Sequence, residues 1–330
     1  MDNNKKIVFS GVQPSGNLHI GNYLGAITQW VEMQDKYSCI FCVVDYHAIT
    51  VKQDPRILKN KIIEAAKIYM ASGINPEKSV IFQQSDIKEH AELAWVLNCT
   101  SARISDLNKM TQFKDKAGKN QENVGVGLYD YPVLMASDIL LYDTDAVPVG
   151  DDQSQHVELC RTLARRFNTQ FGETFKIPEL VIRKGGARIM GLDDPKKKMS
   201  KSASNAGNYI ALSDDPKVAV KKIMRAVTDS GSEVKYDEKK KPAISNLLTI
   251  YSLLAGESIK DLEKHYKGKG YGEFKKDLAE VVGNFLMQFQ KKYNSFNDED
   301  VIEILKAGVE KIQPIATETI EKVKKTIGVK

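Results

Sequence analysis

The sequence predicts an α/β domain built on a parallel sheet, followed by a C-terminal all-helical domain. Short apolar runs alternate with segments of helical periodicity through roughly the first two hundred residues, a pattern typical of strands joined by crossover helices. From about residue 204 the strand-like runs stop, and amphipathic helices bounded by Gly, Pro, Asp or Ser follow one another. Neither part contains a repeat or a low-complexity stretch.

The expected strands are short and apolar, as strands buried on both faces of a parallel sheet should be. They cover residues 6–12 (KIVFSGV), 39–45 (CIFCVVD), 79–85 (SVIFQQS) and 145–150 (DAVPVG). The helices expected between and after them have apolar residues at helical spacing and cover residues 21–33, 55–74, 131–142 and 151–167. The last of these opens on two aspartates, which the positive end of a helix dipole stabilises.

The C-terminal part is expected to be helical throughout. Its amphipathic segments cover residues 214–227, 243–256, 258–266, 272–293 and 298–312. Three basic side chains, Lys221, Lys222 and Arg225, line one side of the first segment, and contact between them and nucleic-acid phosphate is a hypothesis.

Composition sets the class of protein. A chain of 330 residues, 42% hydrophobic and 28% charged, can bury a large core, and its formal net charge of +5 permits a nucleic-acid partner without requiring one. It shows neither a leader nor an apolar run long enough to cross a bilayer, so we expect a cytoplasmic protein. Cys39 and Cys42 lie in an expected strand without a second ligand pair, which favours structural thiols over a metal site.

The first chemical signal is the turn between the first strand and the first helix, residues 10–26 (SGVQPSGNLHIGNYLGA). Unpaired N–H groups at a helix N-terminus attract phosphate, and glycines such as Gly16 and Gly21 allow a close approach. His19 adds a side-chain donor. The alternative is a tight turn capped by a histidine, and the spacing matches neither of two common phosphate loops.

The second signal is the lysine stretch, residues 196–205 (KKKMSKSASN), at the junction of the two parts. It has no apolar periodicity and should be a mobile loop. It could be a solvated charge run in a linker. The alternative is that Lys198 and Lys201 stabilise the charge that develops on a polyphosphate leaving group.

Together these motifs resemble the two signatures of class I aminoacyl-tRNA synthetases: residues 14–22 (PSGNLHIGN) and 198–202 (KMSKS). Six further stretches occur in the order seen in the bacterial-type tryptophanyl-tRNA synthetases: VVDYHAIT, KMTQFK, LMASDILLY, VPVGDDQSQHVEL, GARIMGL and AVTDS. The resemblance extends from Phe9 to the C-terminal helices. Asn22 replaces the second histidine of the general first signature, as is usual in this branch, whereas residues 101–110 match the family poorly.

The resemblance implies a Rossmann-type catalytic domain over residues 1–203, with an inserted helical dimerisation segment at about 86–130. Residues 204–330 would bind the tRNA anticodon, and their last helix could pack back on the catalytic domain. It also implies tryptophan–tRNA ligation: L-tryptophan and ATP give tryptophanyl-adenylate and pyrophosphate, and the amino acid then passes to tRNA(Trp). A homodimer, Mg²⁺ held by the ATP phosphates, and neither a DNA nor a membrane partner complete the expectation.

The resemblance also assigns the nucleotide site. Residues from both signatures, and residues meeting the ribose and the adenine, would bind ATP: Gln13, Pro14, Ser15, Gly21, Asn22, Gly150, Asp151, Asp152, Ile189, Lys198, Met199, Ser200, Lys201 and Ser202. The residues expected to act on the phosphates are His19, Lys116, Lys198, Ser200 and Lys201, with Lys114 as a further possibility. No metal ligand is assigned.

The amino-acid pocket centres on Asp138, which lies in an otherwise apolar helix. An ionised carboxylate there is costly without a donor, and an indole N–H is such a donor. The family places this aspartate on the indole, and its other expected contacts with tryptophan are Phe9, His47, Met135, Val147, Val149 and Gln153. Without the resemblance, the apolar residues would be read as ordinary core, and Asp138 as a helix cap or an ion-paired group.

Three alternatives stay open: a tyrosyl-type synthetase, a catalytically silent synthetase-like protein that binds tRNA or tryptophan, and another nucleotidyltransferase with the first signature. The remaining histidines, His90, His156 and His265, are expected to be packing or surface residues rather than catalysts. Because a site that hydrogen-bonds its substrate rejects analogues by about 10⁴–10⁵-fold, no editing domain is expected.

Overall fold

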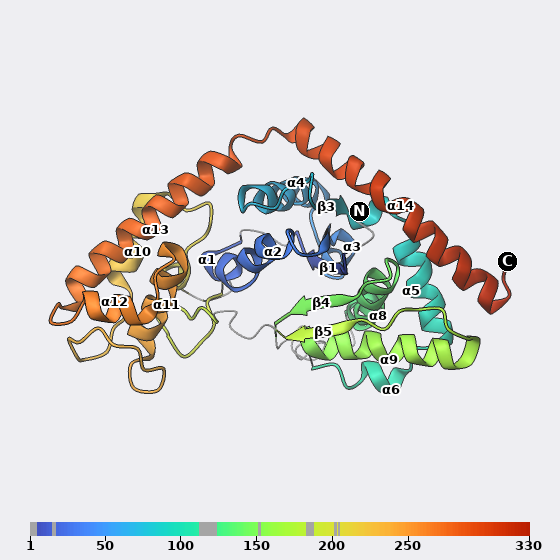
Figure 1. Cartoon of the computed structure of the whole chain (residues 1–330), viewed down its shortest axis with the longest axis horizontal. Helices are drawn as coiled ribbons and strands as arrows, with labels where there is room; N and C mark the ends of the chain where they lie inside the picture. Colours follow the sequence, from blue (N-terminus) through green and yellow to red (C-terminus); the bar gives the residue numbers. More distant parts are fainter. Residues whose placement is uncertain are drawn as a thin grey trace. The chain divides into compact units, whose positions relative to one another are not determined.

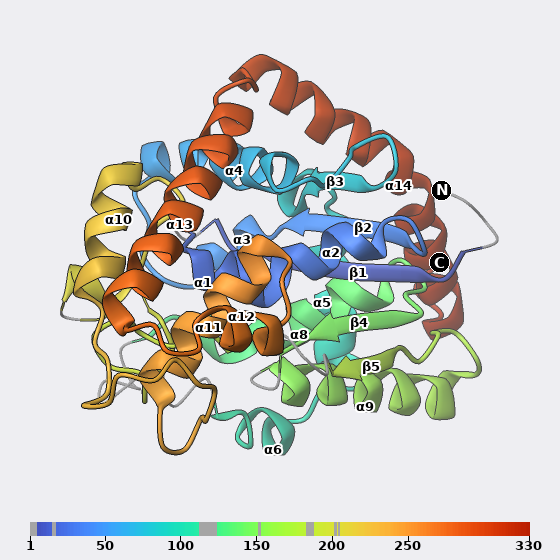
Figure 2. The same ribbon diagram turned by 60° about the vertical axis from the view of Figure 1, so that its left-hand side comes forward.

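A five-stranded parallel sheet in the order β3-β2-β1-β4-β5 forms the framework of the computed structural model (Figures 1 and 2). The structure describes residues 5–14, 18–111, 124–150, 153–182, 188–200, 203 and 205–330. The strands are β1 (Ile7–Val12), β2 (Ser38–Val43), β3 (Val80–Gln83), β4 (Ala146–Val149) and β5 (Glu179–Ile182). Four of them were expected from their apolar runs. The edge strand β5 was missed, and it differs from β3 and β4, which are equally short, in that its Glu179 and Val181 are exposed.

The chain forms two compact units, each made of segments distant in sequence. The first contains the described residues of 1–15, 32–184 and 297–330, and the second those of 16–31 and 185–296. The expected division at residue 203 made the two parts consecutive, apart from a last helix that could pack back on the first part. The difference arises because residues 18–31 pack with later helices, while the last helix packs on the sheet.

The helices of the first unit connect and cover the strands. They are α3 (Asp45–Ala48), α4 (Pro55–Ala71), α5 (Glu89–Thr100), α6 (Ile104–Leu107), α8 (Val126–Leu140) and α9 (Ser154–Phe171), with a 3₁₀ turn η2 at Gln84–Asp86. α4 starts where the sequence indicates, because Asp54 caps the N–H of Arg56 at 2.9 Å and Pro55 suits the first helical position.

Two of the predicted helices differ from the observed ones. α8 begins five residues before the predicted start at residue 131, and Pro132 lies inside its first two turns. α9 begins at Ser154, three residues after the predicted start, so the two aspartates predicted to open it precede its first described residue. Asp151 and Asp152 lie outside the described residues.

The second unit is built from helices that pack on one another. It contains α1 (Ile20–Asn22), a five-residue π-helical turn η1 (Tyr23–Ile27), most of α2 (Thr28–Met33), a 3₁₀ turn η5 (Ala206–Asn208), α10 (Pro216–Arg225), α11 (Pro242–Ala255), α12 (Ile259–His265) and α13 (Tyr271–Tyr293). The helix expected at 21–33 is thus interrupted by the π-helical turn. The ring of Tyr23 in that turn contacts the ring of Phe285 of α13 at an angle of 46°, with centroids 4.7 Å apart. This contact joins residues 18–31 to the later helices.

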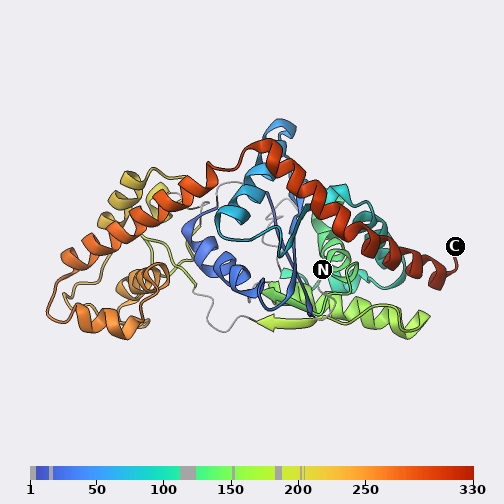
Figure 3. The ribbon, with the colours of Figure 1, turned by 45° about the horizontal axis from the view of Figure 1, so that its top comes forward.

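The last helix, α14 (Asp298–Ile327), completes the first unit along the edge strand β3 (Figures 1 and 3). It was expected to end at residue 312, because the proline at 314 reads as a helix breaker. The helix instead continues through Pro314, and its buried side chains beyond that point, such as Ala316 and Ile320, lie against the core. Among the described residues, no helix is long and apolar enough to cross a membrane.

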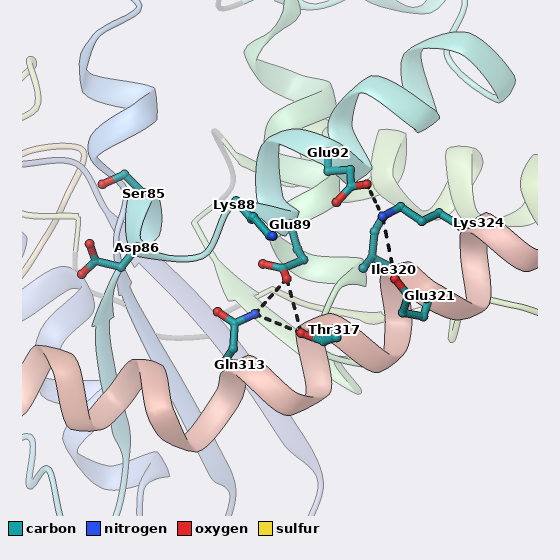
Figure 4. Close-up of a pocket in the computed structure, with 10 residues that line it drawn as sticks. All are labelled: Ser85, Asp86, Lys88, Glu89, Glu92, Gln313, Thr317, Ile320, Glu321 and Lys324. Carbon is teal, nitrogen blue, oxygen red and sulfur yellow. Dashed lines mark hydrogen bonds and ion pairs between the residues drawn. The ribbon is translucent and has the colours of Figure 1, made fainter. Parts of the chain in front are cut away.

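Polar contacts fix α14 against α5 (Figure 4). The buried Glu89 accepts hydrogen bonds from Gln313 Nε2 at 2.9 Å and from Thr317 Oγ1 at 3.3 Å. Glu92, one turn after Glu89 on α5, pairs with Lys324 of α14 at 2.5 Å. These side chains line a cavity of about 420 Å³ between the two helices, so the last helix is tied to the first unit by specific bonds as well as by apolar burial.

Gly308 is the point of closest approach between α14 and the sheet. A Cβ atom at this position would lie 1.9 Å from the carbonyl oxygen of Ile81 in β3, which is backbone and cannot move aside independently. We expect Gly308→Ala to lower the free energy of unfolding by about 1–3 kcal/mol through overpacking, measured by urea denaturation.

Gly272, near the start of α13, provides the matched control, because a Cβ atom there meets nothing within 4 Å. Gly272→Ala should leave the stability unchanged or raise it by up to about 1 kcal/mol. Equal stabilities for Gly308→Ala and the wild type would contradict the close approach.

Candidate active site

A buried carboxylate lies at the centre of the candidate amino-acid pocket. Asp138 of α8 is 1% exposed. Its Oδ2 is 2.8 Å from Nε2 of His47, while its Oδ1 is 2.7 Å from Nε2 of Gln84 and 2.7 Å from Nδ1 of His90. Burial alone would raise the pKa of Asp138, but His47 and His90 outweigh burial through charge and hydrogen bonding and hold the pKa well below its usual range. The carboxylate is therefore ionised.

His90 is a buried partner of this carboxylate rather than a surface residue. Its Nδ1 lies 2.7 Å from Asp138 Oδ1, and its Nε2 lies 2.7 Å from the hydroxyl of Tyr142. Its backbone carbonyl accepts from Ser137 Oγ at 2.6 Å, and its ring stacks on Phe82 with centroids 5.8 Å apart. The sequence offered no signal for this role, because 48 residues separate His90 from Asp138.

The network changes how Asp138 is interpreted. The sequence suggested a carboxylate that needs a donor from a ligand, whereas three protein donors already bind it. A carboxylate has about four acceptor positions, so a further donor can still be bound. The protein donors fix its position, which is what a specificity determinant requires.

The apolar residues predicted around the amino acid do belong together. Phe9, Met135, Val147 and Val149 all lie in or against one hydrophobic core cluster of the first unit. The ring of Phe9 is nearly parallel to that of Tyr142, with centroids 5.9 Å apart, and Tyr142 in turn bonds His90. An unbroken set of contacts therefore links the apolar residues to the Asp138 network.

These residues gather where the strands end. His47 and Gln84 follow the carboxyl ends of β2 and β3, and Val149 is the last residue of β4. The strand order reverses direction between β1 and β4, and ligands of open α/β sheets bind at that edge. Gln153 follows close behind, as the residue that precedes α9, with its N–H donating to the carbonyl of Gly150 at 3.0 Å.

In the second unit, the first signature is paired with the segment that follows the lysine stretch. Ile20 N donates to Ile210 O at 2.9 Å, and Leu212 N donates to Leu18 O at 2.9 Å. His19 lies between these bonds as an antiparallel bridge partner of Ala211. Residues almost two hundred positions apart are thereby held together by backbone hydrogen bonds.

His19 is held in a fixed and unusual state. Its backbone N–H donates to Oδ1 of Asn22 at 3.1 Å, so Asn22 caps the short helix α1. Its ring is 7% exposed, and its Nδ1 has no hydrogen-bond partner within the described parts of the chain. A Cβ atom on Gly21 would lie 2.9 Å from that nitrogen, which explains the glycine. Burial, and then the charge of Lys198, lower the pKa of His19 to about 4.

The lysine stretch pairs with residues 189–191 in the same unit. Gly191 N donates to Lys197 O at 2.8 Å, and Met199 N donates to Ile189 O at 3.0 Å. Ile189 and Met199 are buried, while the side chain of Lys198, which precedes Met199, is exposed. The stretch is therefore anchored up to Met199 rather than unpaired, and its mobility stays a prediction.

Several predicted residues cannot be placed. Ser15, Lys114, Lys116, Asp151, Asp152, Lys201 and Ser202 lie outside the described residues. Gln13 and Pro14 directly follow β1, and Ser200 bonds Asn208 through its N–H. Within the described part of the chain, no group of three or more His, Cys, Asp or Glu side chains is arranged to hold a metal ion.

The interpretation of Lys222 as a phosphate contact is wrong. Its ammonium group is 2.6 Å from Asp214 Oδ2 and 2.9 Å from the carbonyl of Tyr209, so it stabilises the protein instead. Lys221 and Arg225 remain exposed, and they line a cavity of about 400 Å³.

The state of His19 predicts a specific dependence of stability on pH. In the unfolded chain a histidine has a pKa of about 6.5, whereas in the fold His19 has a pKa of about 4. Between these values the unfolded state binds a proton that the folded state does not, so the fold loses stability as the pH falls. We expect His19→Asn to lose less stability than the wild type between about pH 6.5 and about pH 4 in urea denaturation.

His265→Asn is the matched control, because His265 is exposed at the end of α12. It should follow the wild-type dependence. The same loss of stability in His19→Asn as in the wild type would show that His19 titrates normally.

Comparisons with known proteins agree with this geometry. A family model described as tRNA synthetases class I (W and Y) matches residues 1–287. The chain is 55% identical to a tryptophan–tRNA ligase of Caldanaerobacter subterraneus subsp. tengcongensis, over 98% of each protein. The crystal structure of tryptophanyl-tRNA synthetase from Mycoplasma pneumoniae superposes with a TM-score of 0.91 at 37% identity, covering 98% of both chains.

A structure of the Campylobacter jejuni tryptophanyl-tRNA synthetase, complexed with ADP and tryptophan, gives a TM-score of 0.82 at 39% identity. It covers 98% of this chain and 99% of its own. The family match extends over most of the chain, and the relatives match it over nearly its whole length, so the chain belongs to the class I tRNA synthetases of the tryptophan and tyrosine group.

Proposed function

We propose that the chain is a tryptophan–tRNA ligase, which forms tryptophanyl-adenylate and pyrophosphate from L-tryptophan and ATP and then transfers tryptophan to tRNA(Trp). The observation that carries this proposal is the 55% identity, over nearly the whole of both proteins, to a protein named for that activity. The related structure that contains ADP and tryptophan supports the two small substrates. A cytoplasmic location is part of the same proposal.

The Asp138 network supports tryptophan as the amino acid. The carboxylate is fixed by His47, Gln84 and His90, and its remaining acceptor position would take the indole N–H. Phe9 and the neighbouring apolar side chains would hold the rings. A tyrosine side chain would place its O–H donor elsewhere and leave that acceptor position unpaired, and a site built around a hydrogen bond discriminates by about 10⁴–10⁵-fold.

Activation needs positioning and charge more than a covalent nucleophile. The substrate carboxylate attacks the α-phosphorus in line, and the bond to the bridging oxygen breaks as pyrophosphate leaves. The exposed ammonium group of Lys198 would neutralise the leaving charge, together with Lys201 and Lys116. Since the pKa of His19 is about 4, its ring is neutral at pH 7 and would act as a hydrogen-bond donor, not as a cation.

The ribose and the adenine of ATP would be bound by other residues. Gly150, with Asp151 and Asp152, would meet the ribose, and Ile189 the adenine. Mg²⁺ would enter with the phosphates and supply charge neutralisation there.

The helices α10 to α13 are proposed to bind tRNA, including its anticodon. Lys221 and Arg225 are the basic residues of α10 that remain exposed, and they would contact phosphate. Asp214 engages Lys222, which leaves that lysine out of the proposal.

Amino-acid-dependent ATP–pyrophosphate exchange tests the activity. We expect exchange with tryptophan alone among the twenty amino acids. Lys198→Ala should reduce the rate by about 10²–10³-fold, because it removes a charge that acts mainly in the transition state. Lys196→Ala is the matched control, since Lys196 is an exposed lysine of the same stretch, and it should retain most of the rate.

Each other outcome selects an alternative. Exchange with tyrosine would overturn the role of Asp138. No exchange with any amino acid, together with retained tryptophan binding, would indicate a silent binding protein. Equal rates for Lys198→Ala and the wild type would remove Lys198 from the mechanism.

A homodimer is proposed through the segment that contains α5, α6 and the start of α8. Three large apolar side chains are exposed there: Trp95 at 71%, Ile104 at 72% and Val126 at 80%. The three elements are bonded to one another, since Tyr129 Oη donates to Ile104 O at 3.2 Å and Asn98 donates to Asp130 at 2.7 Å. Apolar side chains exposed on adjoining elements indicate an association surface.

The double variant Trp95→Glu/Ile104→Glu should sediment as a monomer where the wild type sediments as a dimer, because it places charges in an apolar contact. Ile57→Glu on α4 is the control: Ile57 is 51% exposed outside this segment, and its variant should remain dimeric. Dimers of unchanged stability in the double variant would exclude the segment as the interface.

A further inference from the structure

We propose that Asn208 is a positioning residue for the lysine stretch: its side-chain amide sets the backbone on which Lys198 is presented. The kinetic part of this proposal rests on the proposed ligase activity, whereas its structural part does not. Every contact that carries it lies in the second unit.

Asn208 is 4% exposed, and both ends of its amide are used. Oδ1 accepts from the backbone N–H of Ser200 at 3.2 Å, and Nδ2 donates to Oδ1 of Asp193. Its backbone is bonded as well, because its carbonyl accepts from Leu192 N at 2.9 Å and its N–H donates to Asn205 O at 3.0 Å. A buried amide with this pattern can bind in one orientation only.

Asp193 connects Asn208 to the far end of the lysine stretch. Its second oxygen, Oδ2, accepts from Nδ2 of Asn205 at 2.8 Å, while Oδ1 of Asn205 accepts from Gly207 N at 2.9 Å. The carboxylate of Asp193 therefore bridges Asn205 and Asn208, which both follow the signature at residues 198–202. Through Asn208 the same carboxylate is linked to Ser200 within that signature.

Gly191 provides independent evidence for the position of the Asn208 amide, because the absence of a side chain at residue 191 leaves space for it. A Cβ atom at residue 191 would lie 2.1 Å from Nδ2 of Asn208 and 3.1 Å from the carbonyl of Asp194. The position therefore requires glycine while the amide is in place. Gly191 also donates its N–H to Lys197 O at 2.8 Å, so the residue that makes room for Asn208 also anchors the lysine stretch.

Lys198 is thus placed between two anchors. On one side, Lys197 and Met199 bond the backbone of residues 189–191, and on the other, Ser200 bonds Asn208. The functional hypothesis is that these bonds aim the exposed ammonium group, since displacing a catalytic charge by about 1 Å can cost about 10²-fold in rate. Asn208 acts through Ser200 and does not need to touch a substrate.

Asn208→Ala removes the anchor next to Ser200. We expect kcat for tryptophan-dependent pyrophosphate exchange to fall by about 10–100-fold, with the KM for tryptophan unchanged. A merely structural defect would lower kcat only by reducing the fraction of folded, active enzyme. Loss of positioning would lower kcat per active site. The thermal midpoint and the fraction of active sites, measured by adenylate formation, therefore accompany the rates.

A charge exchange gives the sharper test. Asn208→Asp keeps the acceptor for Ser200 N–H but sets two carboxylates against each other, so it should lose as much activity as Asn208→Ala. In the double variant Asp193→Asn/Asn208→Asp the amide and the carboxylate change places. The bonds to Ser200 and Asn205 can then all re-form, and kcat should return to within about threefold of the wild type.

Asn60→Asp is the matched control, because it introduces the same charge at an exposed position of α4. It should not alter kcat. Wild-type kcat in Asn208→Ala, or a double variant as inactive as Asn208→Asp, would overturn the proposal.

Limited trypsin digestion separates this proposal from the ligase activity. Cleavage after Lys196, Lys197 or Lys198 should be faster in Asn208→Ala and return to the wild-type rate in the double variant. If the wild type showed no exchange but the digestion followed this pattern, the ligase proposal would fail while the anchoring role of Asn208 held. Equal cleavage rates in all variants would exclude the anchoring role.

Discussion

The buried carboxylate of Asp138 is the constraint on which the first unit depends. It lies within an apolar core, where an ionised group without donors would cost several kcal/mol. His47 and Gln84 come from the ends of neighbouring strands and His90 from α5, so satisfying one charge requires β2, β3, α5 and α8 to keep a single arrangement. The same demand orients Tyr142 and, through it, the ring of Phe9. Packing of the first unit and the proposed recognition of the amino acid therefore depend on one set of bonds.

In the second unit, backbone pairing connects segments near the two signatures, which are distant in sequence. The strand-like pairing of residues 18–20 with 210–212 brings His19 beside the segment that follows the lysine stretch. Burial of the His19 ring there keeps it neutral, and the nearby Lys198 keeps it so. A neutral donor and an exposed cation are complementary means of binding a polyphosphate, since only the cation compensates net charge.

Much of the fold follows from the sequence, because β1 to β4 lie in apolar runs and the residue before α4, α10, α12 and α14 caps each of these helices with its side chain. What could not be predicted depends on tertiary contacts. Pro314 would end an isolated helix, yet α14 continues through it because the residues beyond are buried against the core. His90 shows no local signal, since its partner Asp138 is brought to it only by packing. In contrast, Asp138 itself stood out as a charge in an apolar helix, and the structure pairs it with His47 and His90, as the ion-paired alternative anticipated. Its contact with an indole stays a prediction.

The position of α14 along β3 also has a consequence for the order in which the protein is made. The edge strand ends at Gln83, but the helix that covers it begins only at Asp298. During synthesis that edge emerges more than two hundred residues before its cover, and an uncovered strand edge is a template for pairing with other chains. The β3 edge therefore stays uncovered through most of translation, so slowing elongation late in the message should increase misassembly.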